Sequence, residues 1–274
     1  MTQPMRRLPD FDDPPVVETV LGVQFSPLER FSIPHIGLYW TKIRSSYPQC
    51  ETQAPLSPVV EEFGPRKPRT DATPGIEFAP EPPVRCWFMN PSSTRLLQLQ
   101  KDRFIQNWRK VKGDEVYPRY ETLRSSFPEE WQRFCRFLEE ERLGTPDVNQ
   151  CEVTYVNHIE IGRGWQSYGE IQRVVACWSG KYSGDFLPEP ETVRLNISYL
   201  MPDKRGRLHI IMEPAIRRID ATEILQLRLT ARGRPASSSV EDILDWFDTG
   251  HEWIVSGFTD FTTSEMHRIW RRRV

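Results

Sequence analysis

The sequence feature that most constrains the fold is a regular alternation of apolar and polar residues in three runs of the second half. Successive side chains of a β-strand point to opposite faces, so each run predicts a strand with one apolar and one polar side. The apolar positions are Val193, Leu195, Ile197, Tyr199, Leu208, Ile210, Met212, Leu225, Leu227 and Leu229. The polar positions are Arg194, Asn196, Ser198, Arg207, His209, Gln226, Arg228 and Thr230. We therefore expect an α+β fold in which helices pack on one face of an antiparallel sheet and the other face is polar.

The expected elements follow the same order twice along the chain. In the first half they are a strand at 16–25, a helix at 32–47, strands at 84–89, 94–100 and 103–108, and a helix at 118–144. In the second half they are a strand at 151–161, a helix near 168–178, strands at 193–201, 207–214 and 224–231, and a final helix after Ser239. We predict two β-α-β-β-β-α halves, 1–146 and 147–274, that join into one integrated unit. Gln98, Gln100, Arg103, Asn107, Thr154 and His158 then extend the polar face.

Between the first helix and the next strand lies a long segment, 48–83, that contains nine prolines and little periodicity. Connections in compact domains are usually about 4–6 residues long, so this one predicts an extended excursion over the surface. Its acidic pair, Glu61 and Glu62, is expected to be exposed to solvent.

Composition narrows the class of protein. A formal net charge of −2 argues against binding a polyanion over the whole surface but leaves room for a local basic face. The five cysteines are an odd number without a C-x-x-C spacing, which is typical of reduced thiols. The N-terminal residues lack the apolar segment of a signal peptide, and no run approaches the roughly 18 apolar residues of a membrane helix. We expect a cytoplasmic protein without a membrane partner.

The residues that most resemble a reactive pair are Cys151 and His158. They lie seven positions apart in one predicted strand and therefore on opposite faces, so they cannot form a nucleophile–base pair. Cys151 is expected to be buried, and His158 to lie on the polar face. His251 and His267 are too far apart for a metal-binding motif, and His251 is expected at the boundary of the core on the final helix. The sequence predicts neither a catalytic site nor a cofactor.

Four segments carry a resemblance to a known family: "PPVVETVLGVQF", "VTYVNHI", "WFDTGHEWIVSGF" and "FTTSEMHRIW". With them the chain resembles a sporadically distributed family of uncharacterised bacterial proteins of about this length. The matching positions are Glu18, Tyr155, Asn157, His251 and Trp270. The resemblance covers most of the chain and implies one integrated bacterial module. The family has no assigned activity, so the resemblance implies none for this chain.

These observations favour a non-enzymatic binding protein that presents its polar, arginine-bearing sheet face to a macromolecular partner, with a protein favoured over a nucleic acid. The candidate binding residues are Arg103, Asn107, Lys110, His158, Arg194, Asn196, His209 and Arg228. The sequence is also compatible with a homo-oligomer.

Two alternatives remain open. The first is a nucleic-acid-binding protein in which Arg103, Lys110, Arg194 and Arg228 contact phosphates. The second is a small-ligand carrier or enzyme whose pocket lies between the final helix and the sheet, near Trp246, His251 and Trp253.

Overall fold

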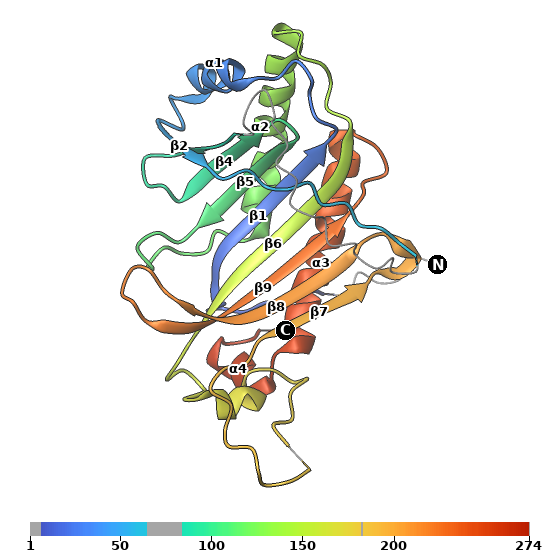
Figure 1. Cartoon of the computed structure of the whole chain (residues 1–274). Coiled ribbons are helices and arrows are strands. Elements are labelled where there is room, and N and C mark those ends of the chain that lie inside the picture. The colour runs from blue at the N-terminus through green and yellow to red at the C-terminus, as the bar shows by residue number, and fades with distance from the viewer. Residues whose placement is uncertain (1–6, 65–83, 182, 274) are drawn as a thin grey trace.

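The computed structural model describes residues 7–64, 84–181 and 183–273. Nine strands of these residues form one sheet in the order β2-β3-β4-β5-β1-β6-β9-β8-β7, and every neighbouring pair is antiparallel (Figure 1). The strands are β1 (Val16–Phe25), β2 (Gln49–Gln53), β3 (Arg85–Met89), β4 (Arg95–Gln100), β5 (Arg103–Arg109), β6 (Val148–Glu160), β7 (Leu195–Leu200), β8 (Arg207–Ile216) and β9 (Glu223–Gly233). The helices are α1 (Ile33–Ile43), α2 (Tyr120–Glu140), α3 (Val240–Phe261) and α4 (Ser264–Ile269), with 3₁₀ turns η1 (Tyr168–Arg173) and η2 (Pro202–Lys204).

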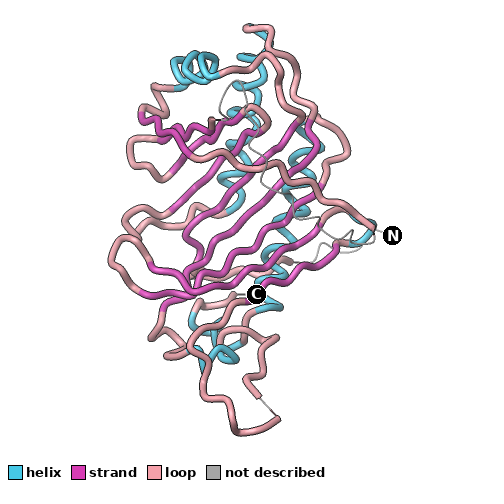
Figure 2. The backbone as a smooth tube through the Cα atoms, in the orientation of Figure 1, coloured by secondary structure: helices cyan, strands magenta, loops and turns pink. Residues whose placement is uncertain are grey.

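The order of the strands is mirrored about the central pair, β1 and β6. On one side of β1 lie β5, β4 and β3, and on the other side of β6 lie β9, β8 and β7. The helix that follows each set, α2 or α3, packs on the same face of the sheet, behind the strands in Figure 1. Figure 2 shows the strands running side by side from one half into the other. The halves therefore share one sheet.

The alternation read from the sequence separates the two faces as expected. Leu208, Leu227 and Cys151 point to the helices and are at most 2% exposed, whereas Arg228 and His158 belong to the opposite set of positions, which we call the polar face. The α+β fold with helices on one side of an antiparallel sheet is confirmed.

Aromatic side chains form the centre of the core between the sheet and α2. Phe134 of α2 is fully buried and lies against five other rings within 6.2 Å between centroids. These rings belong to Phe25, Phe31, Tyr39, Phe104 and Trp131. The ring of Phe127 meets Phe247 of α3 edge to face at 4.9 Å, so one core continues from α2 to α3.

Two expectations about local structure were wrong. The helix near 168–178 is only the six-residue 3₁₀ helix η1, because the backbone beyond it pairs with the link between α3 and α4. The amide of Ala176 donates to the carbonyl of Phe261, and the amide of Thr263 donates to that of Val174. The other error is β2, which occupies the start of the proline-rich segment and extends the sheet beyond β3.

The ends of the described chain lie together. Phe11 and Arg272 form an isolated antiparallel bridge, and Arg273 pairs with Asp10 and Asp12. Ser239 begins α3 as predicted, since its hydroxyl accepts the amide hydrogen of Asp242 at 3.1 Å. Of the helices in the described ranges, none has the length and hydrophobicity needed to cross a bilayer.

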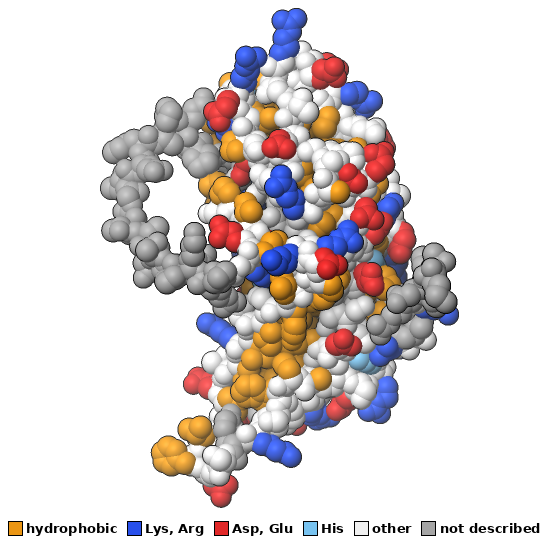
Figure 3. Space-filling view, turned by 90° about the vertical axis from the view of Figure 1, so that its right-hand side faces the viewer, with side chains coloured by type: hydrophobic (Ala, Val, Ile, Leu, Met, Phe, Trp, Pro, Cys, Tyr) orange, Lys and Arg blue, Asp and Glu red, His pale blue; other side chains and the backbone are white. Residues whose placement is uncertain are grey.

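The edge strand β7 is less covered than the centre of the sheet. Leu195 and Ile197 are half-buried, and Tyr199 and Leu200 are exposed by 43% and 54%. Figure 3 views the molecule from the side on which β7 is outermost and shows a stripe of hydrophobic side chains low on this side, below a region of mixed acidic and basic residues.

Candidate polypeptide-binding face of the sheet

A segment of the chain's own backbone crosses the polar face. Residues 54–63, which we call the strap, leave β2 and run across the strands toward β8 (Figures 1 and 2). The proline-rich segment is therefore a surface excursion, as expected, but up to residue 64 it lies on the sheet and covers the middle of the polar face. The rest of the predicted excursion, 65–83, lies outside the described residues.

Three glutamines from three strands bind the backbone of the strap. The amide of Leu56 donates to Oε1 of Gln100 at 2.9 Å, and its carbonyl accepts from Nε2 of the same side chain at 2.9 Å. The amide of Val59 donates to Gln24 at 2.9 Å, and that of Glu61 donates to Gln150 at 3.2 Å. These glutamines are at most 7% exposed, so each carboxamide replaces the water that a free backbone would bind. The face thus holds an extended backbone much as a neighbouring strand would.

Three arginines complete the recognition of the strap backbone. The carbonyl of Ala54 accepts from Arg85 at 2.9 Å, and that of Ser57 accepts from Arg103 at 2.9 Å. At the other end, the carbonyl of Glu62 accepts from Arg207 at 2.7 Å. These contacts do not depend on the side chains of the strap.

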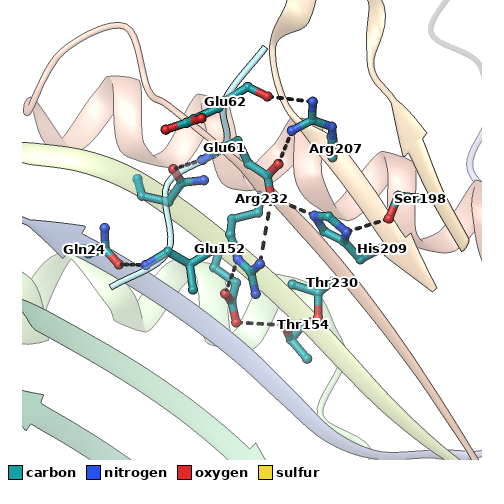
Figure 4. Close-up of polar contacts among 12 residues, drawn as sticks. Gln24, Glu61, Glu62, Glu152, Thr154, Ser198, Arg207, His209, Thr230 and Arg232 are labelled. Atoms are coloured by element: carbon teal, nitrogen blue, oxygen red, sulfur yellow. Dashed lines mark hydrogen bonds and ion pairs between the residues drawn. The ribbon is translucent and has the colours of Figure 1, made fainter. Parts of the chain in front are cut away.

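Glu61 is the strap residue whose side chain is most firmly bound (Figure 4). Its carboxylate is only 7% exposed and contacts Nη1 of Arg207, Nε2 of His209 at 2.6 Å and, at 3.8 Å, Nη1 of Arg232. Burial alone would raise the pKa of Glu61, but the hydrogen bonds from His209 and Arg207 outweigh it and hold the pKa below its ordinary value. The expectation that this residue is exposed was wrong, because three basic side chains of the sheet surround it.

A second row of polar groups supports these basic residues from the sheet. Arg232 donates to Glu152 at 2.7 Å, and Glu152 accepts from the hydroxyl of Thr154 at 3.0 Å. On the other side, the second ring nitrogen of His209 lies 2.9 Å from the hydroxyl of Ser198. Arg232 and His209, which hold Glu61, are therefore also held by hydrogen bonds to the sheet (Figure 4).

The strap does not fill the space above the sheet. A gap of about 40 Å³ remains beneath Leu56 and Val59, next to Gly22 and Ile105. Val59 and Val60 are 38% and 57% exposed. Polar contacts to the backbone and the Glu61 carboxylate, and not apolar packing, thus hold this segment in place.

Beyond the strap, a chain of hydrogen bonds runs across the polar face from β3 to β1. Trp87 donates to Gln98 at 2.9 Å, Gln98 donates to Asn107 at 2.8 Å, and Asn107 donates to Glu18 at 2.7 Å. Burial raises the pKa of Glu18, although the hydrogen bond from Asn107 and the charge of Arg109 act in the opposite direction. Asn107 is 2% exposed, so its amide serves this internal network.

The eight candidate binding residues are distributed along the whole polar face. The structure brings Arg103 and His209 together with the strap. Lys110 and His158 instead line a separate depression of about 390 Å³ next to the opposite end of β6. Arg228 lies 3.7 Å from Glu213. Arg194, just before β7, and Asn196 on it are exposed at the edge of the sheet.

The structure has a cavity next to the final helix, and its lining differs from the one expected. A cavity of about 200 Å³ lies between α3, β6 and the N-terminal residues 8–16, and His251 is on its wall. Trp246 is 1% exposed and donates to the carbonyl of Arg205, so it is part of the core. Trp253 is half-buried and packs against the core. Neither tryptophan lines the cavity.

Glu61, Gln24, Gln150 and Arg232 are the main site residues that sequence reasoning missed. One signal was available: Gln24, Gln100 and Gln150 all fall at polar-face positions near strand ends, and a glutamine amide can both donate to and accept from a backbone. No local signal marks Glu61, since its partners come from distant strands.

Comparison of this chain with protein-family models, with curated proteins and with solved structures finds no match. The family resemblance therefore stays a prediction.

Proposed function

We propose that this protein is a non-enzymatic binding protein whose polar sheet face holds an extended segment of polypeptide, with a carboxylate of that segment between Arg207, His209 and Arg232. The observation that carries the proposal is the strap, which serves as an intramolecular example of such a ligand. A partner protein with an extended acidic segment would make the same contacts in place of the strap.

The kind of contact supports a polypeptide partner. Gln24, Gln100 and Gln150 pair with amide groups that recur along any polypeptide, and the donors on Arg85 and Arg103 meet peptide carbonyls. Recognition of this kind derives affinity from the main chain and specificity from a few side-chain positions. Here the position of Glu61 supplies the specificity.

The charges of the polar face favour a protein over a nucleic acid. Arg103 lies 4.0 Å from Asp102, Arg228 lies 3.7 Å from Glu213, and Arg232 is paired with Glu152. A phosphate backbone would have to displace these carboxylates or lie beside them, whereas high affinity for nucleic acid comes from unneutralised basic residues that release counterions.

The experiment that tests this proposal uses a fluorescent peptide with the sequence of residues 54–64. Its binding is measured by anisotropy against the wild-type protein and against the Glu61→Ala variant, in which the strap has lost its carboxylate. Because the intact strap competes at a high effective concentration, the peptide is expected to bind the variant at least about tenfold more tightly. A peptide with Gln at the position of Glu61 should bind about tenfold more weakly, and one with Gln at the position of Glu62 should bind unchanged.

A single-stranded oligonucleotide of similar length serves as the control for phosphate binding. The proposal predicts weak binding to both protein forms. It is contradicted if the oligonucleotide binds tightly, with an affinity that falls steeply with added salt, while neither peptide binds the Glu61→Ala protein.

A further inference from the structure

The helix-covered side of the sheet contains a second site, separate from the strap. The cavity of about 200 Å³ beside His251 is closed on one side by Leu8, Phe11, Pro14 and Val16 of the N-terminal residues, and on the other by Leu229, Ile254 and Phe258. An apolar cavity of about 150 Å³ can hold a benzene molecule. This one therefore has room for a single substituted aromatic ring.

Its polar wall is a chain of buried hydrogen bonds. The hydroxyl of Tyr117 donates to that of Tyr155 at 2.9 Å, and the Tyr155 hydroxyl lies 3.0 Å from Nδ1 of His251. With Tyr117 as donor, the proton of the Tyr155 hydroxyl points to Nδ1, and the imidazole carries its own proton on Nε2. Asn157, 1% exposed, lies on the same wall and donates to the carbonyl of Leu227 at 3.0 Å.

All of these polar groups are uncharged near neutral pH. Burial raises the pKa of the Tyr117 hydroxyl to about 12 and that of Tyr155 well above its ordinary value. Burial lowers the pKa of His251 to about 4, although the charge of Asp248 acts against this. At the mouth, Arg119 is paired with Asp10 at 2.9 Å. An anionic ligand would lose its hydration there without meeting an unpaired positive charge, which is unfavourable, and Glu121, the remaining charged residue of the lining, is exposed.

The geometry of the wall suits a flat ring. The imidazole of His251 stacks on Tyr120 with centroids 4.0 Å apart and an angle of 5° between the planes. Phe11 and Phe258, which also line the cavity, meet edge to face at 5.6 Å. Aromatic rings pack well in such a mixture of flat and edge contacts.

We propose that this cavity binds a neutral, single-ring aromatic molecule that carries a hydroxyl or similar hydrogen-bonding group, which pairs with the wall formed by Tyr155, Asn157 and His251. The N-terminal residues that form its outer wall are held in place by ion pairs of Asp10 with Arg119 and Arg273 and by the backbone bridge between Phe11 and Arg272. The ligand site thus depends on the contact between the two ends of the described chain.

The test is calorimetric titration of the full chain with three probes of similar size: p-cresol, toluene and p-toluate. The proposal predicts that p-cresol binds about tenfold more tightly than toluene, because it adds a hydrogen bond, and that p-toluate binds more weakly than either. In the Val255→Phe variant, which fills the cavity from the half-buried side of α3, binding of p-cresol should be lost. Val116→Phe, at a residue that is 87% exposed and does not line the cavity, is the matched control and should bind as the wild type does.

Nuclear Overhauser contacts provide a measurement that does not rely on a variant. Bound p-cresol should show them to the ring of His251 and to the side chain of Ile254. The proposal is overturned if p-cresol does not bind, if it binds Val255→Phe as tightly as the wild type, or if p-toluate is preferred. Loss of this site would leave the polypeptide-binding proposal untouched, because the strap lies on the other face of the sheet.

Discussion

The Nε2 atom of His209 lies 2.6 Å from a carboxylate oxygen of Glu61, although the two residues are 148 positions apart in the chain. This contact joins the proline-rich segment of the first half to a strand of the second half. Arg207 and Arg232 contact the same carboxylate, so three basic side chains of the polar face surround this one negative charge.

The first prediction concerns the stability contributed by Glu61. Glu61→Gln keeps the shape of the side chain but leaves Arg207 and Arg232 without its charge. We expect a loss of about 1.5–3 kcal/mol in the free energy of unfolding, the range found for hydrogen bonds to charged groups. Urea denaturation measures it. Glu62→Gln is the control and should change stability little, since the structure shows Glu62 bound through its backbone carbonyl and its side chain lies on an exposed residue.

The second prediction is the pH dependence of the strap. The folded pKa of Glu61 lies below its ordinary value, so its stabilising contribution is present above that ordinary value and is lost as the pH falls through the folded pKa. Hydrogen exchange of residues 54–63, followed by mass spectrometry after correction for intrinsic rates, should show weaker protection at about pH 3 than at neutral pH. In Glu61→Gln the protection should depend much less on pH. Equal dependence in both proteins would exclude Glu61 as the cause.

The third prediction concerns His251. Burial lowers its pKa to about 4, so between its ordinary pKa and about pH 4 the unfolded chain binds more protons than the folded one. The folded protein should therefore lose stability over this range as the pH falls, by on the order of 3 kcal/mol from this residue. Denaturation curves of the wild type and His251→Gln measure it: the loss should be smaller in the variant. A loss of the same size would show that His251 titrates normally.

The fourth prediction concerns the contact between α2 and α3. Asp248 accepts hydrogen bonds from Tyr120 at 2.8 Å and from two nitrogens of Arg124 at 2.6 and 2.7 Å. Because Arg124 and Asp248 are both more than one-third exposed, solvent weakens the pair and a coupling energy of only about 0.5–1 kcal/mol is expected. A double-mutant cycle of Asp248→Asn and Arg124→Gln measures this energy, and a coupling indistinguishable from zero would refute the prediction.

The fifth prediction concerns the aromatic core. Phe134→Ala should lower the free energy of unfolding by about 3–5 kcal/mol, because it leaves a cavity among five rings. Phe186→Ala, at a residue that is 95% exposed, is the control and should have almost no effect. Similar losses for the two variants would contradict the packing described for α2.

The fold was predictable from the sequence where buried residues recur at a regular spacing along a strand. Alternation in strands such as β8 and β9 separates the two faces, since a residue such as Leu227 is buried by its position in the strand. The short 3₁₀ helix η1 was not predictable as such, because its length is set by backbone pairing between Val174 and Thr263, which are far apart in the sequence.

The candidate site was predictable only in part. Arg103, Arg207 and His209 follow from the alternation, but Arg232, which lies just beyond the predicted strand 224–231, and the strap do not. The strap is held through its own amides and carbonyls by side chains such as Gln24, and such contacts leave no pattern in the hydrophobicity of residues 54–63. Glu61 therefore looked like an ordinary loop residue.

The most direct test of the polypeptide-binding face is to follow hydrogen exchange of the protein's own residues 54–63 while a free peptide of the same sequence is added. If the face holds one extended segment at a time, the peptide should displace the strap, and exchange at the amides of Leu56, Val59 and Glu61 should accelerate as the peptide concentration rises. Binding of the peptide with unchanged exchange at these three amides would contradict the account.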